Sequence, residues 1–153
     1  EMYSSYLYLS MSAYFADIGL SGFASWMNMQ AQEELMHAMK FYDFIIERGG
    51  RVKLQAIDAP DHDWDSPLAV LEQTLEHEQY VTKRINDLVD AAMDERDHAT
   101  NIFLQWFVTE QVEEEDSVNE VLSKIKLLGD GKGMFMLDKE MGERTFTWPG
   151  QAV

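Results

Sequence analysis

Residues 32–37, Gln-Glu-Glu-Leu-Met-His, place acids and a histidine in the middle of a long apolar-periodic segment. Steps of seven residues define two ladders there: Phe23, Gln30, His37 and Phe44, and Met27, Glu34 and Phe41. Residues seven apart lie two turns along the same face of an α-helix. Glu34 and His37 therefore occupy positions where core residues are expected, and three-residue spacing sets their side chains next to each other.

A carboxylate left uncompensated in a protein core costs several kcal/mol, so this pattern predicts a compensating partner, for which a metal cation is our hypothesis. One Glu-x-x-His is weak support, because an acidic chain often contains one by chance. Acids or amides also interrupt the apolar ladders of other segments. These ladders are Leu71, Glu78, Ile85 and Ala92; Leu104, Gln111, Val118 and Ile125; Phe107, Glu114, Val121 and Leu128; and, at the start of the chain, Glu1, Tyr8 and Phe15.

Composition favours one all-α domain. A chain of 153 residues is long enough to form a single core. Its three prolines and the scarcity of alternating β-branched runs favour helices over strands. We expect helices over about 1–17, 22–48, 66–93, 98–128 and 133–142 within a single domain, 1–153. Glycines within 129–133 are expected to separate the last two helices, and the tail from Thr145 is expected to fray.

Local signals fix several of these boundaries. Ser21 is expected to cap the second helix, Gly49 to end it, and Ser66-Pro67 to start the third. The linker at 49–65 can span roughly 55 Å, more than the roughly 40 Å length of the second helix. It is expected to pack through Val52, Leu54, Ile57 and Trp64. A four-helix bundle with one long crossover and a short fifth helix is predicted.

The net charge and the absence of cysteine argue against several kinds of partner and binding site. A formal net charge of −16 speaks against binding nucleic acid or an anionic membrane and suits cations. With no cysteine, disulfides, thiolate zinc sites and iron–sulfur clusters are excluded. The sequence has no apolar stretch of membrane-spanning length, and a cytoplasmic location is expected.

The ladders supply a ligand set: Glu1, Glu34, His37, Glu78, Gln111 and Glu114. Carboxylates with one imidazole and no sulfur suit iron or manganese better than structural zinc. Two cations would balance several carboxylates, and Glu34, flanked by the other ligands, is the expected bridge between them.

The chain resembles the prokaryotic non-haem ferritins, which are di-iron carboxylate proteins, over nearly its whole length. The resemblance lies in Glu-Met-Tyr-Ser-Ser-Tyr-Leu-Tyr at 1–8, Gln-Glu-Glu-Leu-Met-His at 32–37, Glu-His-Glu-Gln at 76–79 and Phe-Leu-Gln-Trp-Phe-Val-Thr-Glu-Gln-Val-Glu-Glu-Glu at 103–115. It implies a ferritin-like bundle and a ferroxidase centre.

By this resemblance, Glu1, Glu34 and His37 bind the first iron. The second iron is held by Glu34, Glu78 and Glu114, with Gln111 close by. A third, looser iron would be bound by Glu33, Glu110, Glu113 and Glu114, and Tyr8 would be the tyrosine beside the pair. The three outer acids Glu33, Glu110 and Glu113 have an alternative interpretation as ordinary solvated charge.

The resemblance also implies a hollow homo-oligomeric shell, usually of twenty-four subunits, that stores a ferric mineral. Fe(II) is its substrate, and dioxygen or hydrogen peroxide is the oxidant. Haem-binding bacterioferritins place a methionine directly after the bridging glutamate, where this chain has Leu35. No haem is therefore expected.

Two other function classes remain open. One is a di-iron enzyme of another kind, either a rubrerythrin-like peroxidase, which usually carries a cysteine-based iron domain, or an oxygenase, which tends to be longer. The other is a helical oligomer that sequesters metal without oxidising it.

Overall fold

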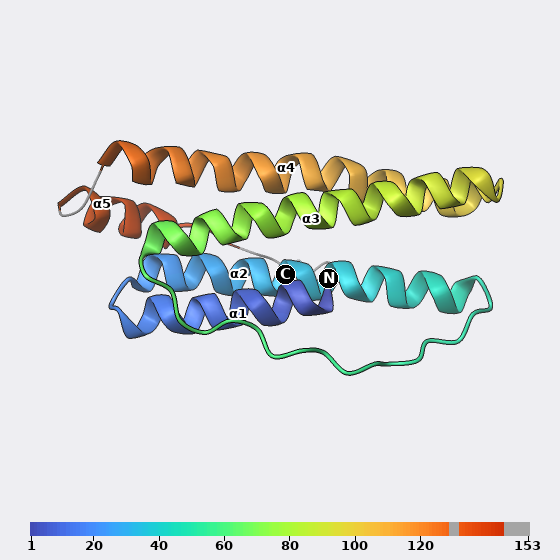
Figure 1. Ribbon diagram of the computed structural model, residues 1–153, viewed down its shortest axis with the longest axis horizontal. Coiled ribbons are helices and arrows are strands. Elements are labelled where there is room, and N and C mark those ends of the chain that lie inside the picture. The colour runs from blue at the N-terminus through green and yellow to red at the C-terminus, as the bar shows by residue number, and fades with distance from the viewer. Residues whose placement is uncertain (129–131, 146–153) are drawn as a thin grey trace, which may run out of the picture. The chain divides into compact units, whose positions relative to one another are not determined.

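The computed structural model describes residues 1–128 and 132–145. Within these residues the chain forms five α-helices and no strand, which confirms the all-α prediction (Figure 1). The helices are α1 (Met2–Asp17), α2 (Ser21–Glu47), α3 (Pro67–Asp94), α4 (His98–Leu128) and α5 (Lys132–Met141). The glycine-rich break at 129–131 and the tail at 146–153 lie outside the described residues.

The helices group into two compact units. The first unit contains α1, α2, the linker as far as Trp64, and α5, whereas the second contains α3 and α4. Each unit is built on a helical hairpin with a short connection, α1 with α2 and α3 with α4. The prediction of a single domain stays a prediction.

In the first unit, α1 and α2 pack along apolar stripes beside a tight turn. Gly19 adopts a φ of 79° in this turn, a conformation that glycine reaches without steric cost. Phe15 and Phe23 stack across the turn with ring centroids 5.0 Å apart. Both rings are fully buried, so they fix the hairpin through the contact of their apolar faces.

The start of α2 is capped from the far end of the chain. The Asp138 carboxylate on α5 accepts hydrogen bonds from the backbone N–H groups of Gly22 and Phe23, at 2.8 and 3.0 Å. The prediction that Ser21 caps this helix is wrong: Ser21 is the first helical residue and Leu20 stands at the cap position without a side-chain bond. A carboxylate satisfies these two free donors and also complements the positive end of the helix dipole.

The linker between α2 and α3 begins with a glycine turn. Gly49 has a φ of 76°, and the N–H of Gly50 bonds to the carbonyl of Ile45, which ends α2 as predicted. Residues 51–64 are non-helical. The later part of the linker lies beside α1 (Figure 1), where Trp64 meets Tyr14 edge-on with ring centroids 5.3 Å apart.

The packing predicted for two linker residues is wrong. Leu54 is 80% exposed and Ile57 is 45% exposed, whereas Val52 and Trp64 are partly buried. The hydroxyl of Ser10 on α1 donates to the backbone carbonyl of Asp61 at 2.6 Å. Since the linker is anchored through its backbone and Trp64, the apolar side chains of Leu54 and Ile57 are not needed to hold it.

In the second unit both helices carry local N-terminal caps. Ser66 accepts a hydrogen bond from the N–H of Ala69 at 3.1 Å and precedes Pro67, as predicted. Asp97 accepts from the N–H and the hydroxyl of Thr100 at the start of α4. Between the helices, Arg96 adopts a φ of 55°, so the chain reverses in a few residues.

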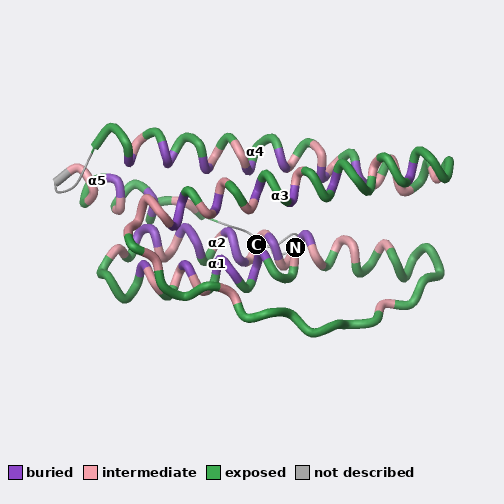
Figure 2. Tube along the Cα trace, in the orientation of Figure 1, coloured by how far each residue is buried: buried purple, intermediate pink, exposed green. Residues whose placement is uncertain are grey.

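Buried residues form stripes along the helices (Figure 2). The stripes are mostly apolar, but they include buried acids, amides and a histidine near their middle. In the part of the chain that is described, no helix combines the length and the apolar character that a membrane crossing requires. The polar interruptions of the stripes are the candidate site.

Candidate metal centre

In the first unit, α2 turns two polar side chains into its buried face. Glu34 and His37 are each only 1% exposed, and His37 Nδ1 lies 3.8 Å from Glu34 Oε1. Glu1, directly before α1, brings a carboxylate to the same place: one possible ligand atom from each of these residues lies within 4.8 Å of the others. The sequence-predicted ligands of the first iron are therefore close together.

Five side-chain atoms of this cluster are buried and make no hydrogen bond within the described part of the chain. Among the described residues, both carboxylate oxygens of Glu34, both ring nitrogens of His37 and Glu1 Oε2 have no hydrogen-bond donor or acceptor. The Glu1 carboxylate acts electrostatically on His37, and Glu34 Oε1 lies 3.8 Å from His37 Nδ1. Such an arrangement of oxygen and imidazole donors fits a cation of the iron or manganese type.

Burial also sets the protonation state of the histidine. Desolvation lowers the pKa of His37 from 6.5 to about 4, although the Glu1 carboxylate opposes this shift. The imidazole is neutral at pH 7, the state in which its nitrogens are able to coordinate a metal. No proton must leave His37 before a cation binds.

The second unit presents the predicted ligands of α3 and α4. Glu78 is 1% exposed, Gln111 2% and Glu114 5%. Gln111 Nε2 donates to Glu78 Oε2 and to the Glu78 backbone carbonyl, both at 3.2 Å. The amide of Gln111 thus holds the Glu78 carboxylate in place, and Glu114 lies one turn further along α4.

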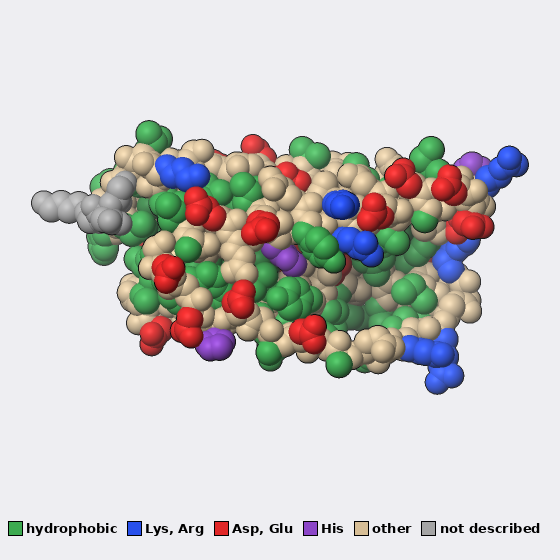
Figure 3. Space-filling model, in the orientation of Figure 1, with side chains coloured by type: hydrophobic (Ala, Val, Ile, Leu, Met, Phe, Trp, Pro, Cys, Tyr) green, Lys and Arg blue, Asp and Glu red, His purple; other side chains and the backbone are tan. Residues whose placement is uncertain are grey.

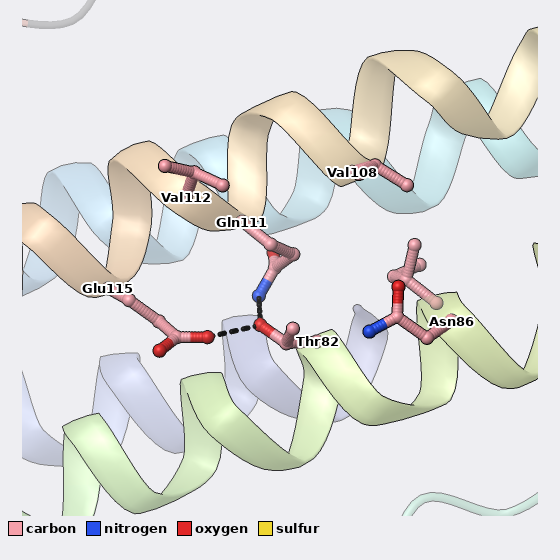
Figure 4. Close-up of a pocket in the computed structure, with 7 residues that line it drawn as sticks. Thr82, Asn86, Val108, Gln111, Val112 and Glu115 are labelled. Carbon is pink, nitrogen blue, oxygen red and sulfur yellow. Dashed lines mark hydrogen bonds between the residues drawn. The ribbon is translucent and has the colours of Figure 1, made fainter.

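A chain of hydrogen bonds continues from these residues to the surface of the second unit. Gln111 Nε2 lies 3.3 Å from Thr82 Oγ1, and the Thr82 hydroxyl donates to Glu115 Oε1 at 2.6 Å (Figure 4). Together with Ile85, Asn86, Val108 and Val112, these residues line a pocket of about 300 Å³. The lining of the pocket therefore includes Gln111, whose amide orients Glu78.

The remaining predicted site residues have more varied surroundings. Glu33 is partly buried and forms an ion pair with Arg144, with Arg144 Nη2 2.6 Å from Glu33 Oε2. On α4, Glu110 is partly buried and Glu113 is exposed. Tyr8 is completely buried in α1. The assignment of all these residues to iron sites stays a prediction.

Sequence reasoning missed four residues that shape these sites. The sequence pattern places Thr82 and Glu115 among ordinary polar residues on helix surfaces. Their connection to the site becomes visible only in the structure, where Thr82 links Glu115 to Gln111 through hydrogen bonds. Asp138 and Arg144 follow α4 and reach α2 across more than a hundred residues of sequence. No local spacing predicts such contacts, since periodicity reports one helix at a time.

Acidic side chains outnumber basic ones in this chain. The chain carries 28 Asp and Glu against 12 Lys and Arg, and red side chains are spread over the visible face in Figure 3. A surplus of negative charge raises the local concentration of cations around the protein. Both the surface and the buried donors therefore suit a divalent metal.

Comparison with known proteins places these observations in a family. The model of the ferritin-like domain matches residues 1–128. A bacterial non-heme ferritin of Bacteroides fragilis (strain YCH46) is 50% identical over 94% of this chain and 90% of its own length. A probable bacterial non-heme ferritin-like protein of Haemophilus influenzae is 43% identical over 93% of this chain and 87% of its own.

Solved structures agree with these relatives. The open-pore ferritin of Archaeoglobus fulgidus superposes with a TM-score of 0.93 at 57% identity, covering 94% of this chain and 90% of that one. A closed form of the same ferritin, obtained by site-directed mutagenesis, gives a TM-score of 0.94 at 58% identity over 95% and 90% of the two chains. The predicted four-helix bundle with its short fifth helix is confirmed.

Proposed function

The chain belongs to the ferritin family of iron-storage proteins, and we propose that it stores iron by oxidising Fe(II) at its buried acids and depositing the ferric product. The observation that carries the proposal is the convergence of Glu1, Glu34 and His37, whose ligand atoms lie within 4.8 Å of one another. Two of these three residues are almost fully buried. Such a cluster departs from the usual composition of a stable core, which is the expected signature of a functional site.

The proposed chemistry follows from the donor types. Carboxylates stabilise Fe(III) relative to Fe(II), which favours electron transfer from bound iron to dioxygen or hydrogen peroxide. His37 is neutral at pH 7 because burial lowers its pKa to about 4, so its ring is ready to bind. Two irons held by a shared carboxylate supply electrons jointly to one oxidant.

We assign the ligands as the family resemblance implies. Glu1, Glu34 and His37 take the first iron, and Glu78 and Glu114 take the second together with Glu34. Gln111 orients Glu78 through its amide, at 3.2 Å, and Tyr8 stands beside the pair. Glu33, Glu110 and Glu113 serve a third, looser iron with Glu114.

The assembly and location belong to the same proposal. We propose a shell of identical subunits, twenty-four as the family resemblance implies, that encloses the ferric mineral in the cytoplasm. Large apolar side chains are exposed in the single chain, among them Phe135 and Met136 of α5 at 75% and 73%. Contact with further copies would remove these surfaces from water.

Anaerobic loading with Fe(II), followed by oxygen, tests the proposal optically. Rapid oxidation and growth of a ferric mineral are expected. Iron that stays bound but reduced would instead identify a metal-sequestering oligomer, and preferential consumption of hydrogen peroxide without mineral would identify a rubrerythrin-like peroxidase. Turnover of an organic substrate would point to an oxygenase.

A further inference from the structure

Arg144, three residues beyond the end of α5, makes three contacts with one face of α2. Its Nη2 lies 2.6 Å from Glu33 Oε2, its Nη1 donates to Gln30 Oε1, and its Cζ lies 5.3 Å from the centroid of the Trp26 ring. A guanidinium that pairs with a carboxylate, an amide oxygen and an indole face at once is held in one orientation.

The setting of these contacts is sheltered from water. Gln30 is fully buried and Trp26 is 4% exposed, while the side chains of Glu33 and Arg144 are 17% and 28% exposed. Charge pairing at such a site is less screened than on an open surface. The pair therefore matters for any second cation that approaches Glu33.

The same segment is anchored at its other end. Asp138 caps α2 through Gly22 and Phe23, so α5 contacts the start of α2, and the side chain of Arg144 reaches Glu33 in the middle of that helix. Two carboxylates therefore link this segment to α2: Asp138 at the start of the helix and Glu33 in its middle. The second of these is the carboxylate that we assign to the third iron.

We propose that Arg144 is the resident counter-cation of Glu33, so that metal binding at Glu33 and docking of the segment at 142–145 exclude each other. The inference rests on the proposed function, which supplies the metal at Glu33. One oxygen of the carboxylate is already engaged by the guanidinium, and a fixed positive charge repels a divalent cation at the other. A metal binds Glu33 only as Arg144 leaves, which keeps the third iron weakly held and links its occupancy to the C-terminal segment.

Zn(II) titration of the assembled, metal-free protein tests this without redox chemistry. Arg144→Gln removes the charge but keeps a polar side chain, and we expect it to tighten the weakest Zn(II) site roughly tenfold. The tighter sites should stay within about twofold. Arg144→Lys, which retains the charge without the fork of donors, should give a smaller gain. Arg51→Gln, the same change at an exposed linker residue, is the matched control and should have no effect.

A double-mutant cycle ties the effect to Glu33. In a Glu33→Gln background the gain from Arg144→Gln should vanish, because the carboxylate that both cations share is gone. Hydrogen exchange provides a second readout: saturation of the wild type with Zn(II) should speed exchange at residues 142–145, whereas Glu33→Gln should exchange at a rate that Zn(II) does not change.

Two results would overturn the inference: an unchanged weakest site in Arg144→Gln, or exchange at 142–145 that Zn(II) leaves unaltered in the wild type. Failure of the proposed function looks different. If the proposed function fails, the wild type does not oxidise Fe(II) rapidly, whatever the Zn(II) affinities are. If only the inference fails, Fe(II) oxidation is intact and the Zn(II) affinity of the third site does not change when Arg144 is replaced.

Discussion

Glu34 is a buried carboxylate whose position is explained by function rather than by stability. It is 1% exposed, and desolvating a carboxylate in a core costs more than an apolar side chain of similar size. Replacing Glu34 by Leu should leave the metal-free protein as stable or more stable, by ~1–3 kcal/mol if the leucine packs well. Chemical denaturation of the metal-free variant and wild type measures the difference. Marked destabilisation would identify Glu34 as a structural core acid.

His37 should make the metal-free protein pH-sensitive. Its pKa is lowered from 6.5 to about 4 by burial, so between these values the unfolded chain binds a proton that the folded chain does not. The neutral ring therefore contributes fully to the free energy of unfolding above pH 6.5. This contribution falls by about 2–3 kcal/mol as the pH drops toward 4.

The variant His37→Gln isolates this contribution, because glutamine does not titrate. Free energies of unfolding measured from pH 7 to 4 should fall more steeply for the metal-free wild type than for the variant. Parallel pH profiles for the two proteins would show that His37 does not titrate in this window.

The candidate site was predictable from the sequence as far as single helices determine it. The seven-residue ladders selected Glu34, His37, Glu78, Gln111 and Glu114, and all five are buried. The contacts that distant segments make with these helices were not predictable. Arg144 pairs with Glu33 across 111 residues of sequence, and the periodicity of neither segment carries information about the other.

At the scale of elements, Asp138 couples α5 to the start of α2. Asp138→Ala removes the acceptor of two backbone N–H groups and should lower stability by ~1–2 kcal/mol. Amide exchange in α5 should accelerate at the same time. Lys139→Ala, a neighbouring exposed position, is the control, and equal exchange in both variants would contradict the role of Asp138.

The absence of a side chain at Gly22 allows α5 to lie close to the start of α2. A Cβ at this position would lie 1.6 Å from the carbonyl oxygen of Asp138, a separation that forces α5 to move. The sequence specifies some helix ends better than others. Ser66 and Gly49 start and end their own helices, and both were predicted. The cap of α2 comes from α5 and was wrongly assigned to Ser21. A cap supplied by a distant segment leaves no signature in the residues around the helix end.

At the scale of the whole molecule, α5 is expected to contribute to assembly. Phe135 and Met136 are largely exposed in the single chain, and a charge on them would oppose burial against another copy. Phe135→Glu should shift the iron-free protein toward smaller species in light scattering, whereas Lys139→Glu on the same helix should not. A wild type that is a monodisperse monomer or dimer would contradict the predicted shell.

If the buried acids and His37 bind the iron that dioxygen or hydrogen peroxide oxidises, Glu34→Leu should abolish rapid Fe(II) oxidation, which stopped-flow absorbance measures. Glu34 is the proposed shared ligand of both irons, so its loss removes the arrangement in which two metals act on one oxidant. The rapid phase should disappear while the metal-free variant stays folded. A rapid phase of wild-type rate and amplitude in Glu34→Leu would contradict it.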